Sequence, residues 1–247
     1  MASWSDQVAA VTGSRGAIGA AIVAELSGRG AKVCGGDVQI APSDDIPVVD
    51  VTDPVSIEGW LDGVERLGPL SIGVVCAGIS RAGRLVEISD ADWNEVVAVN
   101  LTGAFYTARA MIKRMLAHSM GGRIVFVGSW AAHEPHPHIG AYSAAKAGMR
   151  ALCQTLALDH ATDGILVNEV APGIVNAGLS RELFRRDRAL EERTRAAIPT
   201  GLVLEPADVA RDVAFLASPE NRHTTGACLV SDGGLSLSSV MNPGTRG

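Results

Sequence analysis

The stretch QVAAVTGSRGAIGAAIVAEL, residues 7–26, joins a short apolar run to a helical pattern through a glycine-rich turn. The run ending at Thr12 favours a buried strand, and the pattern over 17–29 favours a helix. Gly13, Gly16 and Gly19 stand at three-residue spacing between the two. Glycines in such a turn let the backbone approach a pyrophosphate at the helix N-terminus. The stretch therefore predicts the first strand–loop–helix unit of an α/β fold, although a glycine turn alone also serves close packing.

The rest of the chain repeats this alternation of short apolar runs and longer helical patterns. Near-continuous apolar runs indicate parallel strands that are covered on both faces, and their alternation with helices predicts a doubly wound sheet. We expect seven strands, at 7–12, 31–37, 46–50, 71–78, 122–129, 165–173 and 226–234. Helices are expected near 17–29, 53–67, 101–118, 141–162 and 206–217. No linker or repeat interrupts the pattern, so residues 1–247 are interpreted as one domain.

Composition excludes several classes of protein. The net charge of −6 is opposite to the basic surface of a general nucleic-acid binder. The sequence has no signal-peptide pattern and no apolar run of the roughly 18 residues that a membrane span needs. The four cysteines are far apart along the chain, which favours buried thiols over a disulfide framework. We therefore expect a cytoplasmic protein that binds neither nucleic acid nor membrane.

Asp37 ends the second expected strand, 18 residues after Gly19. An acid at that place in a dinucleotide-binding unit accepts a hydrogen bond from the ribose 2′-hydroxyl and repels a 2′-phosphate. Asp37 therefore favours NAD over NADP. Arg15 opposes this interpretation, because a guanidinium in the glycine loop can pair with that phosphate.

Tyr142 and Lys146 stand four positions apart in GAYSAAKAGMR, residues 140–150. Helical spacing places both side chains on one face. Taken alone, the pair is more typical of a surface helix with a half-buried ring. The alternative is a phenol whose proton moves during a reaction.

Taken together, the motifs resemble those of the short-chain dehydrogenase/reductase family over essentially the whole chain. The motifs, in order, are TGSRGAIG, DVTD (50–53), CAG (76–78), VNLTGAF (99–105), Ser129, YSAAK (142–146), VAPG (170–173) and SDGG (231–234). The resemblance implies a single Rossmann-like domain, a nicotinamide cofactor and an active site of Asn100, Ser129, Tyr142 and Lys146. It also implies cofactor contacts from Gly13, Ser14, Arg15, Ala17, Ile18, Asp37, Asp50, Val51, Cys76, Ala77, Gly78, Asn100, Tyr142, Lys146, Pro172, Gly173 and Ile174.

Three positions depart from the family pattern. Ala17 replaces the middle loop glycine, and Val75–Cys76 replaces the usual asparagine pair before AG. Ala177 stands where a threonine often binds the nicotinamide carboxamide, with Asn176 or Ser180 as candidate substitutes. These departures bear on local cofactor contacts and leave the expected reaction class unchanged.

The family resemblance also gives Tyr142 a chemical role. A free tyrosine has a pKa of about 10, and a nearby ammonium together with an oxidised nicotinamide lowers it toward neutral pH. Tyr142 would then exchange a proton with an alcohol or carbonyl, Lys146 would support it and hold the ribose, and Ser129 would hold the substrate oxygen. Asn100 would anchor a water that links Lys146 to solvent.

Two further segments bear on the substrate. HEPHPH, residues 133–138, could bind a metal through His136 and His138, but its prolines and the lack of a distant ligand predict no metal site. Contact of Trp130 and His133 with substrate is the favoured interpretation. Residues 175–204 are expected to form a lid. Its residues Arg181, Arg185 and Arg188 would share one helical face without an acidic partner and could bind an anionic substrate, unless the helix is simply solvated.

The sequence thus predicts an NAD-dependent oxidoreductase that interconverts a secondary alcohol and its ketone. A ring, sugar, polyol or dihydrodiol alcohol is the favoured small-molecule substrate. The alternative is a 3-oxoacyl-thioester reductase, which usually uses NADP and is disfavoured by Asp37. A dinucleotide-binding regulator without turnover is the remote alternative, because it would not need Ser129, Tyr142 and Lys146 together. The family resemblance implies a homotetramer.

Overall fold

The computed structural model describes residues 3–39 and 47–241. Six parallel strands form one sheet in the order β2-β1-β3-β4-β5-β6. The order places the first strand inside the sheet, with later strands added on its other side, as expected for a doubly wound fold. The strands are β1 Val8–Thr12, β2 Lys32–Gly36, β3 Ile72–Val75, β4 Gly122–Val127, β5 Ile165–Pro172 and β6 Cys228–Ser231.

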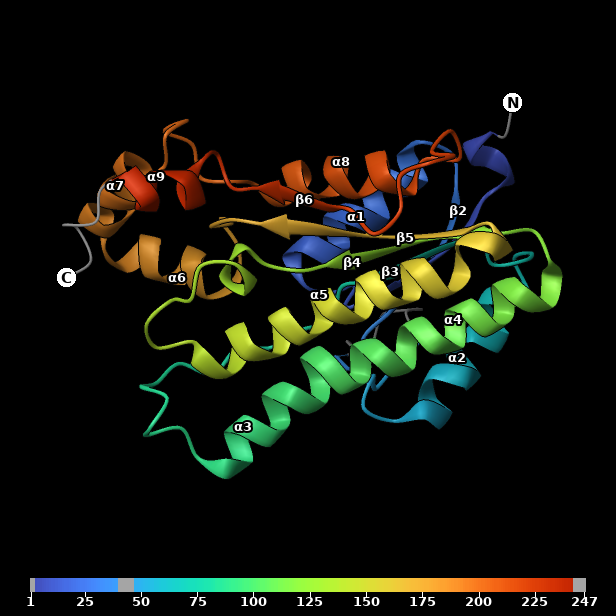
Figure 1. Cartoon of the computed structure of the whole chain (residues 1–247), viewed down its shortest axis with the longest axis horizontal. Coiled ribbons are helices and arrows are strands. Elements are labelled where there is room, and N and C mark those ends of the chain that lie inside the picture. Colours follow the sequence, from blue (N-terminus) through green and yellow to red (C-terminus); the bar gives the residue numbers. More distant parts are fainter. Residues whose placement is uncertain (1–2, 40–46, 242–247) are drawn as a thin grey trace.

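Helices cover both faces of the sheet (Figure 1). One core packs α1 and α8 against the sheet, and the other packs α2, α4 and α5 against the opposite face. The longer helices are α1 Ala17–Gly28, α2 Pro54–Glu65, α3 Asp90–Val97, α4 Ala104–His118, α5 Gly140–His160, α6 Gly178–Arg186, α7 Arg188–Ala197, α8 Pro206–Ala217 and α9 Leu235–Met241. Short helical turns are η1 Trp4–Asp6, η2 Ala98–Gly103, η3 Trp130–Ala132 and η4 Ala161–Asp163.

The buried strands explain why this architecture forms. Every residue of β1, β3 and β5 is buried, which is the pattern of parallel strands with helices on both sides. Local signals then fix where the helices begin. The Asp53 side chain accepts from the backbone N–H of Val55 at 2.9 Å, and Pro54 occupies the first turn of α2.

Of the seven expected strands, the third, at 46–50, is not a strand in the structure, which describes this segment from residue 47. Asp37 and Val48 form only an isolated bridge, held by Asp37 N–H to the Pro47 carbonyl at 3.3 Å and Val49 N–H to the Asp37 carbonyl at 2.9 Å. Pro47 has no N–H to continue a ladder, and the β2–β1 pairing has already ended at Gly36. Residues 40–46, which lead from the segment after β2 to this bridge, lie outside the described residues.

The end of the chain around the expected lid also differs from prediction. The single helix expected over 181–195 is two helices, because Asp187 breaks it and caps α7 by accepting from Leu190 N–H at 2.9 Å. A further helix, α9, lies beyond the last helix expected from the sequence. These helices gather at one end of the molecule, beyond the carboxyl end of β5 (Figure 1). Within the described residues, no helix combines the length and apolarity that crossing a bilayer requires.

Candidate active site

A cavity of about 980 Å³ lies along the carboxyl ends of the strands. Segments that follow β1, β2, β3, β4 and β5 all contribute to its wall. This is where open α/β sheets bind their ligands. Sixteen of the predicted site residues line it: Gly13, Ala17, Ile18, Asp37, Asp50, Val51, Cys76, Ala77, Gly78, Ser129, Trp130, Tyr142, Lys146, Pro172, Gly173 and Ile174. The predicted residues outside its lining are Ser14, Arg15, Asn100, His133, Arg181, Arg185 and Arg188.

The glycine loop begins this wall. A Cβ on Gly19 would lie 2.1 Å from the Gly13 carbonyl oxygen, so the first turn of α1 closes against the loop only because residue 19 is glycine. Gly16 caps α1 without a side chain, which leaves the helix N-terminus open toward the cavity. The loop fits the pyrophosphate of a dinucleotide, since backbone N–H groups and the helix dipole meet there.

Asp37 directly follows β2, beside the glycine loop. It lines the same cavity and is only 8% exposed. Its two oxygens accept from the backbone N–H groups of Arg15 at 3.0 Å and Gln39 at 2.9 Å. These bonds hold the carboxylate in place with lone pairs still available to a ligand. The backbone of Arg15 thus positions the acid, while the Arg15 side chain is exposed and does not line the cavity.

Thr12 positions the neighbouring turn and was not recognised from the sequence. Its hydroxyl accepts from the backbone N–H groups of Cys76 at 3.1 Å and Ala77 at 3.3 Å, and donates to the Val74 carbonyl at 3.4 Å. The fully buried side chain therefore ties the end of β1 to the segment after β3. The sequence signal for this role is its position: Thr12 ends a buried strand directly before the glycine loop.

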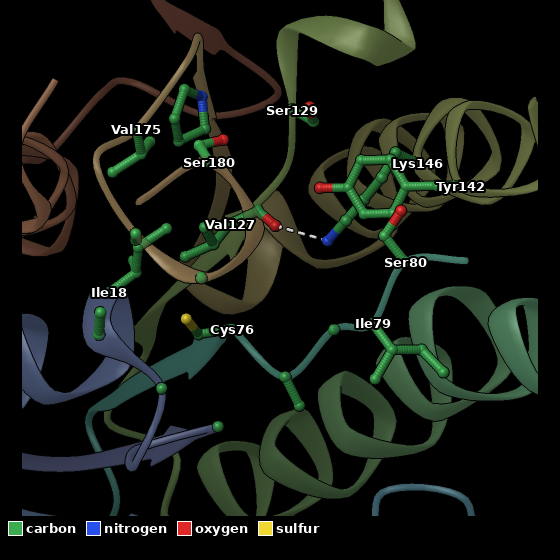
Figure 2. Close-up of a pocket in the computed structure, with 18 of the residues that line it drawn as sticks. Ile18, Cys76, Ile79, Ser80, Val127, Ser129, Tyr142, Lys146, Val175 and Ser180 are labelled. Atoms are coloured by element: carbon green, nitrogen blue, oxygen red, sulfur yellow. Dashed lines mark hydrogen bonds between the residues drawn. The ribbon is translucent and has the colours of Figure 1, made fainter. Parts of the chain in front are cut away.

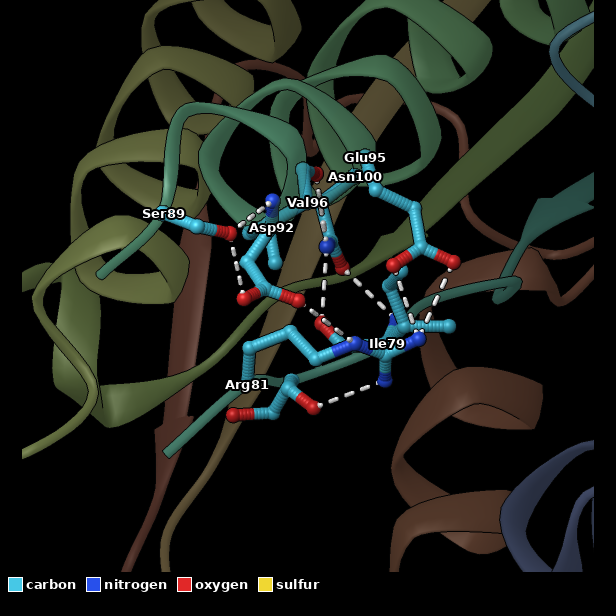
Figure 3. Close-up of polar contacts among 8 residues, drawn as sticks. Ile79, Arg81, Ser89, Asp92, Glu95, Val96 and Asn100 are labelled. Atoms are coloured by element: carbon cyan, nitrogen blue, oxygen red, sulfur yellow. Dashed lines mark hydrogen bonds and ion pairs between the residues drawn. The ribbon is translucent and has the colours of Figure 1, made fainter. Parts of the chain in front are cut away.

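Asn100 acts from behind the cavity wall (Figure 3). It lies in the π-helical turn η2 and is fully buried. Its amide donates to the carbonyls of Ile79 at 2.8 Å and Val96 at 2.9 Å, and its oxygen accepts from Ile79 N–H at 3.3 Å. The side chain thus clamps the segment after β3 to the helices beneath. The contact of Asn100 with a bound water stays a prediction.

Tyr142, Lys146 and Ser129 meet at the inner end of the cavity (Figure 2). Helix α5 carries the first two on one face, and Lys146 Nζ lies 5.6 Å from the centre of the Tyr142 ring. Lys146 is buried and donates to the Val127 carbonyl at 2.9 Å. Ser129 follows β4 and is also buried, and its hydroxyl accepts from Ala131 N–H at 3.2 Å. The prediction from helical spacing is confirmed, since Tyr142 and Lys146 lie on one face of α5. Ser129 lines the same cavity as these two side chains.

The electrostatics differ from the expected lowering of the tyrosine pKa. Burial raises the pKa of Tyr142, and its contact with the Ser129 hydroxyl works in the opposite direction. The ammonium of Lys146 points to the Val127 carbonyl and not to the phenol. It therefore does not lower the pKa of Tyr142 in this structure. Burial also lowers the pKa of Lys146 to about 8, against the attraction of Cys76 and Glu169.

Comparison with known proteins agrees with this arrangement. A family model described as "Enoyl-(Acyl carrier protein) reductase" matches residues 13–236. The 3-oxoacyl-[acyl-carrier-protein] reductase FabG of Haemophilus influenzae is 35% identical over 243 residues, covering 94% of this chain and 99% of that protein. The chain belongs to the short-chain dehydrogenase/reductase family. Membership makes it an oxidoreductase that binds a nicotinamide dinucleotide.

Solved structures of family members superpose closely on this one. A crystal structure with bound NADP, of an Agrobacterium tumefaciens protein provisionally named a 2-deoxy-D-gluconate 3-dehydrogenase, gives a TM-score of 0.86 at 32% identity. That match covers 95% of this chain and 98% of the other. A short-chain type dehydrogenase/reductase from Mycobacterium marinum gives 0.85 at 27% identity, covering 95% and 97%.

The outer end of the cavity in this short-chain dehydrogenase/reductase is apolar. The segment after β5 and the helices α6 and α7 line it with Ile174, Val175, Leu183, Phe184 and Leu190. Phe184 is buried in a small cluster with Ile198 and Val203, which anchors α6 to the loop before α8. The part of the lining that comes from residues 175–204, the predicted lid, is thus mainly aliphatic and aromatic, with Ser180 and Thr194 as its hydroxyl groups.

The three arginines proposed for an anionic substrate do not line this cavity, and their expected arrangement was wrong. Arg188 belongs to α7, not to the helix of Arg181 and Arg185, and it pairs with Glu191 at 3.0 Å. Arg181 donates to the Asn176 carbonyl at 3.1 Å. All three side chains are exposed. The helix break at Asp187 is the physical reason, because it removes the shared face.

Two aromatic side chains, Trp130 and His136, also line the cavity. Trp130 lines the cavity and packs edge-on against His136, with ring centroids 4.5 Å apart, and its contact with substrate stays a prediction. His136 lines the cavity in the place expected for His133. Of the two candidates for the missing carboxamide-binding threonine, Ser180 lines the cavity, whereas Asn176 donates to Glu205 at 2.9 Å outside it.

His133 instead turns to the other side of η3. The Arg150 guanidinium contacts both of its ring nitrogens, and its Nε2 lies 3.5 Å from Cys228 Sγ. His133 therefore does not line the cavity, because its ring packs against Arg150 and Cys228, and its contact with substrate stays a prediction. The absence of a metal site stays a prediction. The reason given for it, the lack of a distant ligand, does not hold, since Glu169 and Cys228 both reach His133.

Proposed function

We propose that this protein interconverts a secondary alcohol and its ketone by hydride transfer with NAD. The observation that carries the proposal is the single cavity that joins the glycine loop and Asp37 to Ser129, Tyr142 and Lys146. A regulator that only bound the dinucleotide would not need a phenol, an ammonium and a hydroxyl at the inner end. Their convergence favours turnover.

Proton movement is assigned to Tyr142. Its raised pKa keeps the phenol protonated at neutral pH, so in reduction it donates its proton to the ketone oxygen and is reprotonated from solvent. In oxidation, favoured at higher pH, the phenolate accepts the proton of the alcohol and releases it to solvent. Ser129 holds the same oxygen through its hydroxyl. Lys146 donates to the Val127 carbonyl at 2.9 Å and to Met149 Sδ at 3.8 Å, and its third N–H is proposed to hold a ribose hydroxyl while its charge supports the phenolate.

A bound nicotinamide dinucleotide supplies the hydride acceptor or donor for this step. The residues proposed to hold it are the glycine loop with Ser14 and Arg15 in its backbone, Asp37 at the ribose, and Asp50 and Val51 at the adenine. Cys76, Ala77 and Gly78 border its middle, and Pro172, Gly173, Ile174 and Ser180 border the nicotinamide.

NAD is proposed over NADP because of Asp37. Its carboxylate is buried and held by two backbone N–H groups, so it cannot swing away from the ribose site. A fixed negative charge accepts from ribose hydroxyls and repels a 2′-phosphate. The Agrobacterium relative that holds NADP shares only 32% of its residues with this chain, so its cofactor does not decide the matter.

The substrate is proposed to carry an apolar part next to the reacting carbon. Residues 175–204 form the lid, and its inner side chains are Leu183, Phe184 and Leu190. Burying apolar surface against them stabilises the complex by about 25 cal/mol for each Å². A ring or dihydrodiol alcohol fits this lining better than a polyol or an anion, since neither arginine nor acid lines this outer part.

A second candidate is the reduction of a 3-oxoacyl thioester. Relatives named FabG from Haemophilus influenzae and Escherichia coli match at 35% and 34% identity over nearly their whole length. An acyl chain also suits the apolar lid. Asp37 remains the feature that opposes this candidate, because such reductases usually use NADP.

Steady-state assays separate the candidates. The protein is tested with NAD and a panel of cyclic secondary alcohols, and with NADPH or NADH and an acetoacetyl thioester. Our proposal expects the highest kcat/KM with NAD and a cyclic alcohol. Preference for the thioester with NADPH favours the second candidate. Binding of NAD with no turnover on either panel would favour the regulator.

Self-association is also proposed. Phe105 on α4, Leu158 on α5 and Phe215 on α8 are large apolar side chains that stay exposed on this chain. Covering them in a homotetramer would remove apolar surface from water. Light scattering of the purified protein tests the mass.

A further inference from the structure

A cluster of three metal-ligand side chains lies behind the Ser129 turn. Glu169 and Cys228 are direct partners in the pairing of β5 with β6, so their side chains share one face of the sheet. His133 reaches them from the residue that follows η3. One potential ligand atom from each residue lies within 4.8 Å of the others. None of the three lines the cavity of the proposed active site.

Glu169 gives an independent sign of an absent ligand. The residue is 1% exposed, and within the described residues no N–H or O–H group donates to its carboxylate oxygens, which have only the weak thiol donor of Cys228 beside them. A buried carboxylate with so weak a donor is costly, which is why such groups are normally paired or bound to a metal. The chain makes room for it, since a Cβ on Gly128 would lie 1.9 Å from Glu169 Oε1.

We propose that His133, Glu169 and Cys228 bind one divalent cation of the Zn²⁺ type, with water as the fourth ligand. Imidazole, thiolate and carboxylate are the ligands that Zn²⁺ takes in proteins. Tetrahedral bonds of usual length place a zinc-bound nitrogen and sulfur roughly 3.6 Å apart. His133 Nε2 and Cys228 Sγ are 3.5 Å apart, so that edge of the tetrahedron is already formed.

Arg150 is the main competitor for this site. Its guanidinium contacts both ring nitrogens of His133, and its charge acts on Glu169 and Cys228. A metal on Nε2 requires the guanidinium to move away from that nitrogen. Without a metal, Arg150 is the first of two cations whose charge acts on Glu169, with Lys146 the second. The two arrangements therefore predict different behaviour when Arg150 is replaced.

The proposed metal would act as a positioning group. Ser129 precedes η3 and His133 follows it, so a bond from His133 to β5 and β6 would fix the turn that carries the serine hydroxyl. The metal would not touch substrate, because its ligands lie outside the cavity. This inference does not depend on the proposed substrate or on NAD.

Metal content and cobalt spectroscopy test the site directly. Protein loaded with Zn²⁺ and then desalted should keep about one equivalent per chain by mass spectrometry of the metal. Protein loaded with Co²⁺ should show a thiolate-to-cobalt charge-transfer band. Cys228→Ser should abolish that band, and Cys228→Ser or Glu169→Gln should lower affinity by at least about tenfold, since losing even an outer partner costs that much.

Cys34→Ser is the matched control, because Cys34 is another half-buried thiol but lies on β2. It should keep the metal and the band. Arg150→Met should keep or raise metal affinity. The proposal is overturned if wild-type protein shows no thiolate band, if the band survives in Cys228→Ser, or if Arg150→Met destabilises the protein while no variant changes metal content. The first of these needs no variant, so a folding failure cannot hide the outcome.

Discussion

The inner wall of the cavity is held by polar side chains, whereas its lid is lined by apolar ones. Lys146 lines the inner wall, Thr12 and Asn100 are buried behind it, and each uses its polar atoms on backbone groups of a neighbouring segment. The lid presents Leu183, Phe184 and Leu190 inward and places its arginines at the surface. The inner wall is fixed by hydrogen bonds between elements, whereas the lid depends on a small apolar cluster.

This difference separates two tasks. Fixed polar groups hold reacting atoms in place and move a proton, so changes there should reduce the rate of the chemical step. Apolar lid residues contribute binding that is similar before and during the reaction, so changes there should act on KM. The predictions that follow compare the two regions.

The largest effect is expected from Tyr142→Phe at the inner wall. The change removes one hydroxyl and keeps the ring, so fold and NAD binding should persist. Turnover should fall by at least about 10²-fold, the low end of what a positioned acid–base group contributes. Steady-state kcat with the best alcohol measures it. Near-normal kcat would remove Tyr142 from the mechanism.

The pH dependence should have opposite signs in the two directions. Burial raises the pKa of Tyr142, so the phenol is protonated at neutral pH and suited to reduction. Oxidation needs the phenolate, so its kcat/KM should rise by up to about tenfold per pH unit below that pKa, while reduction should fall at alkaline pH. Profiles in both directions test the sign. An oxidation rate that decreases as pH rises would contradict the assignment.

Asp37→Ala should change cofactor choice without changing the chemistry. Losing hydrogen bonds to a charged group costs about 1.5–3 kcal/mol, so the preference for NAD over NADP should fall by at least about tenfold. The ratio of kcat/KM for the two cofactors gives the answer. Wild-type preference for NADP would mean that Asp37 does not control the ribose site.

The smallest effects are expected in the lid. Leu183→Ala removes apolar contact at the cavity and should raise KM for a cyclic alcohol about fivefold, or about 1 kcal/mol, with little change in kcat. Arg185→Ala, two positions away and exposed, is the matched control and should change KM by less than about twofold. A larger effect of Arg185→Ala, confined to anionic substrates, would support the hypothesis that the lid binds an anion.

Much of the inner wall could be predicted from sequence because local spacing determines it. The glycine loop, Asp37 and the Tyr142–Lys146 pair each sit at a strand end or within one helix, where a fixed number of residues fixes direction. Asn100 was found only through the family motif. Its clamp on Ile79 joins segments 21 positions apart, which no spacing reveals.

The two helices of the lid and the lack of a strand at 46–50 could not be predicted either. Both depend on contacts that local spacing does not show. Helical spacing placed Arg181 and Arg188 on one face, but the Asp187 cap divides the helix between them. Val48 reads as part of a strand, yet it makes only an isolated bridge with Asp37, where the Pro47 ring removes a donor. His133 likewise depends on sheet partners, Glu169 and Cys228, that are distant in sequence.

The division between inner wall and lid is tested most directly by stopped-flow measurement of NADH formation in a single turnover. Wild type, Tyr142→Phe and Leu183→Ala are compared over a range of one cyclic alcohol. We predict that Tyr142→Phe lowers the limiting rate by at least about 10²-fold at unchanged substrate affinity, and that Leu183→Ala lowers affinity at an unchanged limiting rate. A limiting rate reduced as much by Leu183→Ala as by Tyr142→Phe would contradict the account.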